Sequence, residues 1–335
     1  MEEGAILELI ERLSSEGRVF HYFKDRYALM LLSWFVKDGR TVRDVKSSRF
    51  RGLLEKPVVK SVTKARRDGV ITREALQQRN AAESAGYRIT YDIWGDPHDG
   101  SLQTSRPGMN LVLQVNFPVE HDLAYQWLLE VGEQQPFVVH GHPARAGRYN
   151  TMGWARIDID LDAGEALIEE IQNDWIRNAQ EMAYDAKAAI DNGHDHASIW
   201  CNDGLFQCQA RQFMTYADEV LSAYEDVWAE AVLAAAIEFL IGDLGIRRIF
   251  YHTLAGGNRL KGMDGPPQSL YTTLPRKFCF QEVEESPLFL EKPITPSAAA
   301  VRVEGGKAGR MAGRAIEEPE PEENHPPVRF HLLEL

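Results

Sequence analysis

Two neighbouring glutamates, Glu169 and Glu170, interrupt an apolar stretch of the chain, "GEALIEEIQNDW", residues 164–175. The leucine and isoleucines around them indicate a buried strand, whereas burial of an unpaired carboxylate costs several kcal/mol or raises its pKa. Structural ion pairs would explain the two acids, and so would a general base or an amine-binding group in a cleft beside the strand. The candidate ion-pair partners are Arg156, Arg247 and Arg248.

Successive side chains of a strand point to opposite faces of a sheet, so Glu169 and Glu170 are expected on opposite faces. We therefore predict that one carboxylate projects into an open cleft, within reach of His252 or Tyr271, and that an arginine or backbone amides neutralise the other. His252 lies at the end of the apolar stretch "IRRIFYHT", and the glycines of the following "LAGGN" permit close backbone approach. It is a second candidate site residue, because pockets often form where strands end.

Histidines and cysteines gather in a separate stretch, "NGHDHASIWCNDGLFQC". Its four side chains of metal-ligand type are His194, His196, Cys201 and Cys208. Their spacing matches no common zinc finger, so a local turn with one histidine capping a helix and two partly buried thiols is the alternative to a zinc site. A cysteine nucleophile beside a histidine is a further alternative. His140 and His142 in "HGHP" lie on a predicted strand, where they would share a face and either line the cleft or be structural.

The elements that must position these residues change in kind near residue 80. Before it, "FKDRYALMLLSWFV", "TVRDVKSSRFRGLLE" and "KPVVKSVTKARRDG" have the periodicity and caps of helices, which predicts a small all-α domain over residues 1–80. After it, strand-like segments alternate with helices, and "WARIDIDLDAGEALIEEIQND" predicts a hairpin that turns at "DAG". The expected main domain, residues 81–335, is α+β with a mixed central sheet and flanking helices. A run rich in Gly, Ala, Pro and acids near 304–327 predicts a flexible loop.

Charge is divided unevenly between these two parts of a chain whose net charge is −13. Residues 1–80 hold 17 Lys and Arg against 11 Asp and Glu, whereas the remainder holds 20 against 39. Basic residues recur between Lys37 and Arg67, which would suit a surface for nucleic acid. A solvated helix face, or a patch that docks on the acidic main domain, would give the same pattern. Binding would fall with salt and would depend on Lys60, Lys64, Arg66 and Arg67.

The three cysteines give no disulfide framework, and the acidic amino terminus "MEEGAILELIER" lacks the features of a signal peptide. The expected location is therefore the cytoplasm. The longest apolar run, "VWAEAVLAAAIEFLIG", contains two glutamates and is short for a bilayer span. It predicts a buried helix and no membrane partner.

From the hairpin onward, a long helix, a strand, a short helix and a closing strand pair follow in an order that resembles the second half of the GCN5-related N-acetyltransferase fold. "SLYTTLPRKFCF" is similar to that superfamily's tyrosine, followed by a leucine and a phenylalanine. The resemblance covers residues 87–335 and implies acetyl-CoA or another acyl-CoA, entering between "ALIEEIQND" and "IRRIFYHT". It further implies Glu169 or Glu170 as general base and Tyr271 as general acid. The residues that it places at the cofactor are Ile171, Gln172 and Asn258.

The glycine turn that holds the cofactor pyrophosphate in that superfamily is absent from "IQNDWIRNAQEMAYD", so the resemblance is to a divergent member. "IEEIQNDW" is also similar to a phrase in uncharacterised proteins of phages and other mobile elements, which implies no chemistry. The favoured function is transfer of an acyl group from a CoA thioester to an amine on a small molecule or protein. The alternatives are a degenerate member of the fold that binds nucleic acid or a protein, and hydrolase or transferase chemistry without CoA.

Overall fold

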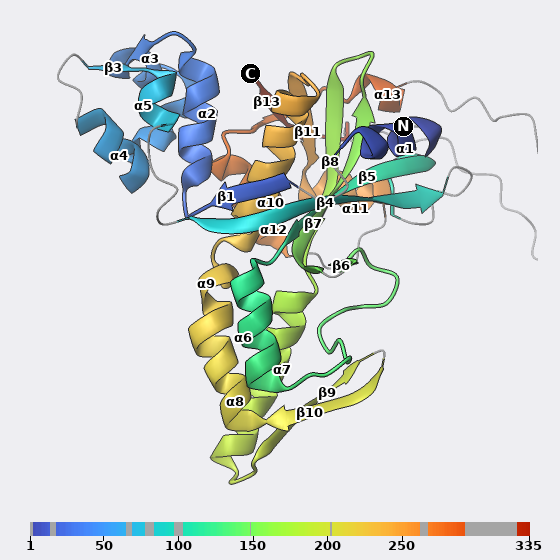
Figure 1. The fold of residues 1–335 in the computed structure, drawn as a ribbon. Coiled ribbons are helices and arrows are strands. Elements are labelled where there is room, and N and C mark those ends of the chain that lie inside the picture. The colour runs from blue at the N-terminus through green and yellow to red at the C-terminus, as the bar shows by residue number, and fades with distance from the viewer. Residues whose placement is uncertain are drawn as a thin grey trace, which may run out of the picture.

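The computed structural model of the chain describes nine stretches of sequence. They are residues 3–13, 18–64, 69–77, 84–96, 103–147, 149–201, 203–261, 267–291 and 327–335. Within them the chain forms a mixed α/β structure in which helices flank a large mixed sheet, as the sequence predicts (Figure 1). The expected flexible loop near 304–327 lies, except for its last residue, outside the described residues.

A nine-stranded sheet runs through the centre of the described structure. Its strands are β1 (Arg18–Tyr22), β4 (Ala85–Asp96), β5 (Gly108–Asn116), β6 (Arg145–Ala146), β7 (Tyr149–Asp160), β8 (Glu165–Gln172), β11 (Arg248–His252), β12 (Gln281–Val283) and β13 (Phe330–Glu334). The order is β1-β4-β5-β7-β8-β11-β13-β12, with β6 paired on β7. Among these described strands only β8 and β11 pair in parallel, and all other neighbours are antiparallel.

The hairpin of β7 and β8 forms where the sequence predicts it. Its turn contains Gly164 at φ 66°, a left-handed backbone that favours glycine. Ile159 and Ile168 project from the two strands into the main core. Leu167 packs on the opposite face with Phe250 of β11, in a second apolar cluster. Both faces of the sheet are therefore covered at β8, so a polar side chain there needs a partner within the protein.

One helix, α10 (Trp228–Glu238), covers β5, β7 and β8 and is buried over most of its length. It continues into a π-helical segment, η4 (Phe239–Asp243), after which Gly245 turns the chain at φ 70°. This is the buried helix that the longest apolar run predicts. Within the described residues, no helix combines the length and the hydropathy that crossing a membrane requires.

Helices connected to β5 and β8 extend away from the sheet and carry a small hairpin at their far end (Figure 1). They are α6 (Val119–Leu129), α7 (Trp175–Asp191), α8 (Ala210–Thr215), the π-helical segment η3 (Tyr216–Leu221) and α9 (Ser222–Glu225), and the hairpin is β9 (His196–Cys201) with β10 (Gly204–Gln209). Buried aromatic rings hold these helices together: His121 stacks on Phe117 and contacts the Tyr216 hydroxyl at 3.0 Å. Beyond the sheet, the shorter helices are α11 (Leu254–Lys261), α12 (Gln268–Lys277) and α13 (Leu288–Glu291).

The prediction of a small all-α domain over residues 1–80 is wrong, because β1 joins the main sheet beside β4. Phe20 and Tyr22, two residues apart in this strand, are buried in the core. The strand is only five residues long, so its alternation is a weak signal in the sequence. A second, two-stranded sheet pairs β2 (Arg40–Thr41) with β3 (Val70–Ile71). The helices of this region are α1 (Glu3–Arg12), α2 (Arg26–Val36), α3 (Val42–Lys46), the 3₁₀ helix η1 (Arg49–Glu55), α4 (Pro57–Lys64) and α5 (Arg73–Gln77).

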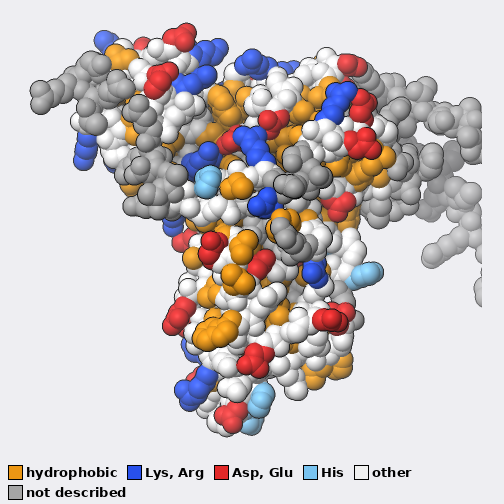
Figure 2. Space-filling view, viewed as in Figure 1, with side chains coloured by type: hydrophobic (Ala, Val, Ile, Leu, Met, Phe, Trp, Pro, Cys, Tyr) orange, Lys and Arg blue, Asp and Glu red, His pale blue; other side chains and the backbone are white. Residues whose placement is uncertain are grey.

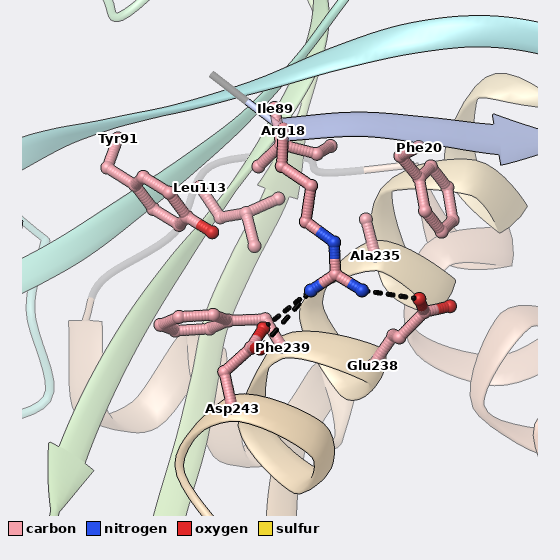
Figure 3. Close-up of a pocket in the computed structure, with 9 residues that line it drawn as sticks. All are labelled: Arg18, Phe20, Ile89, Tyr91, Leu113, Ala235, Glu238, Phe239 and Asp243. Carbon is pink, nitrogen blue, oxygen red and sulfur yellow. Dashed lines mark hydrogen bonds and ion pairs between the residues drawn. The ribbon is translucent and has the colours of Figure 1, made fainter. Parts of the chain in front are cut away.

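Arg18 ties this amino-terminal region to the helix that covers the sheet (Figure 3). Its guanidinium lies 2.9 and 3.2 Å from the two carboxylate oxygens of Asp243 and 3.3 Å from Glu238. The i to i+5 hydrogen bonding of a π turn brings residues five apart toward one face, which lets both acids reach one arginine. Glu238 also pairs with Arg26 at the start of α2, at 3.2 Å.

Candidate functional site

The second half of β8 contains a β-bulge at Glu169. Arg156 of β7 pairs with Glu170, and its successor in β7 pairs with Ile168, which leaves Glu169 without a partner in the register. A bulge places two successive residues opposite one and changes the alternation of side chains. Ile168 and Ile171 consequently both belong to the main core, while the two glutamates share the other face with Arg156. The prediction that the two acids lie on opposite faces is wrong for this reason.

Four donor groups converge on the Glu169 carboxylate from three segments of the chain. The Ser105 backbone N–H donates to Oε1 at 3.0 Å, and the Ser105 hydroxyl donates to Oε2 at 2.8 Å. His252 Nε2, at the end of β11, lies 3.1 Å from Oε2, and Lys261 Nζ, at the end of α11, lies 3.5 Å from it. Glu169 is completely buried, so these contacts replace all of its hydration.

The environment of Glu169 keeps the carboxylate ionised. Burial alone raises its pKa, but the hydrogen bond from His252 and the Lys261 ammonium outweigh burial and lower the pKa to about 2. A carboxylate with this pKa and four donors is a weak proton acceptor at neutral pH. The expectation that one of the two acids projects into an open cleft is also wrong, because Glu169 is 0 % and Glu170 6 % exposed.

Glu170 forms an ion pair with Arg156 across the hairpin, and both side chains are buried. The prediction that an arginine neutralises one of the two acids is therefore confirmed. Arg156 also donates to the Gln103 carbonyl at 3.3 Å, which holds the segment that carries Ser105 over the sheet. The neighbouring Arg106 strengthens this attachment with two hydrogen bonds to Asp158, at 2.6 and 2.9 Å.

His252 is the group in this cluster that is best placed to accept a proton. Burial lowers its pKa, so the imidazole is neutral at pH 7. A neutral ring that donates to Glu169 carries its proton on Nε2, which also lies 2.8 Å from the Ser105 hydroxyl oxygen. Nδ1 is then an acceptor, and it has no hydrogen-bond partner among the described residues. An imidazole held through one nitrogen by a carboxylate, with a lone pair on the other, has the arrangement of a general base.

The parallel strands β8 and β11 separate at this cluster. Their pairing runs from Glu165 and Arg248 to Ile168 and Tyr251 and goes no further. Beyond it β8 continues for four residues, whereas β11 continues for one. The Glu169 carbonyl accepts a hydrogen bond from Lys261 Nζ at 2.5 Å, where a regular parallel pair would supply a strand amide. The candidate site therefore lies where the strands diverge.

The other residues expected at the site differ in position. Tyr271 lies on α12 and is buried, and burial raises its pKa, so the hydroxyl stays protonated. Ile171 points into the main core, and Gln172 is half-buried at the end of β8. Asn258 is exposed on α11, about one turn before Lys261. Tyr271 thus packs against Tyr251 of β11 in the main core, with ring centroids 5.8 Å apart, and Asn258 lies at the surface.

A carboxylate of the chain itself lies beside the amino terminus of α7, which follows β8, without a hydrogen bond to the first helical N–H groups. Asp174 is buried there, 2.9 Å from His142 Nδ1 and 2.9 Å from the Arg177 guanidinium. A helix amino terminus attracts anions, and an acid already in place disfavours a pyrophosphate at the same point. The predicted strand around "HGHP" is wrong: the segment forms turns, with Gly141 at φ 83°, and His140 is exposed.

The histidines and cysteines expected as a weak metal site do not converge. His194 precedes β9 and His196 begins it, and both are exposed, whereas Cys201 lies at the other end of that strand. Cys208 is buried, which raises the pKa of its thiol to about 12 and disfavours a nucleophilic thiolate. Within the described part of the chain, no group of three or more His, Cys, Asp or Glu is arranged to hold a metal ion.

Comparison of the chain with known protein families, with curated proteins and with solved structures finds no match.

The sequence did not indicate two residues of the cluster, Ser105 and Lys261, as site residues. Ser105 belongs to the polar segment "QTSRPG", which has the composition of an ordinary loop. Lys261 ends the helix "LAGGNRLK", where a basic residue is common and usually exposed. Glu169 and Glu170 indicate that hydrogen-bond donors must lie near them, because buried acids require donors. The sequence does not say which donors are close in space.

Proposed function

We propose that residues 87–335 form a divergent acetyltransferase-like fold that transfers an acyl group from a CoA thioester to an amine. The order of the described elements supports the proposal. After the β7–β8 hairpin and an insertion of α7, β9, β10, α8, η3 and α9 come a long buried helix, a strand parallel to β8, two short helices and a closing antiparallel pair, β12 and β13. This is the order that the sequence resemblance implies.

The observation that carries the proposal is the divergence of β8 and β11 at a cluster able to move a proton. After Ile168, the edge of β8 that faces β11 is no longer paired with that strand. Backbone amides and carbonyls on such an edge suit an extended ligand that contains amide groups, as the pantetheine arm of CoA does. The bulge at Glu169 lies at this point, and bulges are frequent beside active sites.

Each residue of the cluster then has a distinct role. Bound acyl-CoA would supply the activated acyl group. Once the amine has reached the buried Nδ1, His252 accepts its proton there, while Glu169 fixes the tautomer and orientation of the ring through Nε2. Tyr271, whose hydroxyl stays protonated, donates a proton to the departing thiolate. Glu169 is therefore a positioning residue here and not the base that the resemblance implies.

Ligand binding and acyl transfer test this proposal together. Acetyl-CoA at a hundred times its Kd should stabilise the folded chain by about 2.7 kcal/mol, which differential scanning fluorimetry measures as a rise in Tm. Release of free CoA in the presence of amines should follow a pH profile that falls on acidification as His252 becomes protonated. His252→Gln should abolish the release, whereas the exposed control His194→Gln should preserve it. The absence of a Tm shift at millimolar acetyl-CoA would contradict the proposal.

A second candidate, a degenerate member of the fold that binds a partner without acyl transfer, is favoured by Asp174. Its carboxylate lies at the helix terminus where the superfamily binds the pyrophosphate. Replacing Asp174 with Asn separates the two candidates, because it removes a negative charge from the helix terminus where the cofactor pyrophosphate would bind. Tighter binding of acetyl-CoA by Asp174→Asn would support a cofactor at this terminus, and no binding by either form would favour the degenerate member.

A further inference from the structure

A compact amino-terminal unit, formed by α2, β2, α3, η1, α4, β3 and α5 (residues 26–77), stands at one corner of the molecule (Figure 1). Apolar side chains from each helix meet inside it, among them Val45, Leu53, Val59 and Leu76, which are at most 2 % exposed. Thr41 caps α3 by exchanging hydrogen bonds with Asp44. The unit therefore presents its remaining side chains on a well-defined surface.

The surface of this unit is strongly basic. The described residues 37–64 contain nine Lys and Arg and three Asp and Glu. The exposed basic side chains, called the basic face below, are Lys37, Arg40, Arg43, Lys46, Arg51, Lys60 and Lys64. Of the three acids, Asp44 accepts hydrogen bonds from the N–H and hydroxyl of Thr41, and Glu55 pairs with Lys60 at 2.7 Å. Figure 2 shows Lys and Arg side chains around this unit at the upper left of the molecule.

The basic face is not used to attach the unit to the rest of the chain. The attachment relies on other cations: Arg18 and Arg26 bind Glu238, and Lys24 binds Asp226 at 2.9 Å. Two basic residues of the segment lie outside the basic face: Lys56 pairs with Asp25, and Arg49 is half-buried over the Phe50 ring. Among the described residues, Arg43, Lys46, Arg51 and Lys64 make no ion pair. A patch that docks on the acidic main domain is therefore not the explanation for these four residues.

The basic side chains of α3 and α4 are aligned by the helical repeat. Arg43 and Lys46 are three residues apart on α3, and Lys60 and Lys64 are four apart on α4, so each pair lies on one face of its helix. Val59 and Val62 bury the opposite side of α4. The rest of the chain is strongly acidic and repels polyanions. A polyanion is therefore expected to contact the protein on the basic face of this unit.

We propose that the basic face binds the phosphate backbone of a nucleic-acid duplex, independently of base sequence. Exposed cations aligned on two helices supply electrostatic contacts to phosphates. Single strands are usually held by bases stacked on aromatic side chains, but the aromatic residue of the described segment 37–64, Phe50, is buried. The proposal is independent of acyl transfer, because no residue of the basic face belongs to the β8–β11 cluster. Two residues expected to contribute, Arg66 and Arg67, lie outside the described residues.

Fluorescence anisotropy with a labelled 20-base-pair DNA duplex tests the proposal, using the full chain at several salt concentrations. The variant carries Arg43→Gln, Lys46→Gln, Arg51→Gln and Lys64→Gln. The matched control carries Lys187→Gln, Arg211→Gln, Arg247→Gln and Arg276→Gln, which are exposed cations elsewhere. Circular dichroism and Tm establish that both are folded. The same measurement with duplex RNA of the same length shows whether the basic face prefers DNA or RNA.

The wild-type chain should bind the duplex with a log Kd that depends steeply on log salt. Loss of four phosphate contacts should reduce the magnitude of that slope by about 3 to 4 and weaken binding at least about 10-fold at low salt. The control should keep the wild-type slope. Equal affinity of wild type and basic-face variant, an equal loss in the control, or binding indifferent to salt would each overturn the proposal.

Discussion

Two clusters of ion-paired side chains, similar in composition, differ in their exposure to water. The cluster at the end of β8 joins Glu169 and Glu170 to Arg156, His252 and Lys261, all at most 9 % exposed. The cluster at β1 joins Arg18 and Arg26 to Glu238 and Asp243, and the Arg18 side chain is 54 % exposed. Water can replace a lost partner at β1, whereas nothing can do so at β8. Burial, more than the number of ion pairs, should therefore set the cost of breaking each cluster.

The largest effect is expected from Arg156→Met, which leaves the Glu170 carboxylate buried without its partner. Removal of one member of a buried pair destabilises by about 3–5 kcal/mol. Urea unfolding at pH 7 measures the loss, with the exposed Arg247→Met, beside β11, as the control. If Arg156→Met and Arg247→Met lowered the free energy of unfolding equally, burial would not be what distinguishes the two clusters.

Acid should destabilise the buried cluster in a defined range of pH. The pKa of Glu169 falls from an ordinary 4.5 to about 2 on folding, so the unfolded chain binds the proton first as pH decreases. The stability that this group contributes is full above about pH 4.5, is lost on the way down to about 2 and amounts to about 3 kcal/mol. His252, whose pKa is also lowered by burial, makes stability fall in the same direction below its ordinary 6.5.

Glu169→Gln isolates the carboxylate in that pH dependence. The variant should lose stability at neutral pH, because burial lowers the pKa of Lys261 and the substitution removes the carboxylate that most favours its charged form. It should lose less on acidification than the wild type. Urea midpoints at pH 7, 5, 4 and 3 measure both effects, with the exposed Glu181→Gln as the control. A variant that follows the wild-type pH curve would show that Glu169 is not ionised in the folded protein.

The hairpin, the helix α10 and the closing strands could be predicted from the sequence because their signals are local. Alternation and a glycine turn specify the hairpin of β7 and β8. The bulge at Glu169 could not be predicted, since it depends on register against Arg156 across the hairpin. Ser105 meets Glu169 from 64 residues away, and Lys261 meets it from 92, so neither contact has a local signal. β1 was missed because tertiary pairing with β4, and not its own five residues, makes it a strand.

Ser105→Ala tests the neutral donor of the buried cluster. It removes the hydroxyl hydrogen bond to Glu169 and keeps the backbone N–H bond, so a loss of about 1.5–3 kcal/mol is expected for a bond to a charged group. Ser222→Ala, which removes a hydroxyl bond to a helix carbonyl at the surface, is the control and should cost less. Equal costs for the two serines would mean that the Ser105 hydroxyl does not hold the carboxylate.

The smallest effect is expected from Arg18→Gln in the exposed cluster of Figure 3. Glu238 keeps Arg26 as a partner, and water can hydrate Asp243, which is itself partly exposed. The change should therefore cost at most about 1 kcal/mol, as exposed ion pairs do. At 1 M salt the Debye length falls to about 3 Å, so the cost should shrink there, whereas the cost of Arg156→Met should persist. Arg18→Gln would contradict the comparison if its effect exceeded that of Ser105→Ala or did not respond to salt, since either result would mean that the π turn shields this pair from water as completely as the sheet shields Glu170.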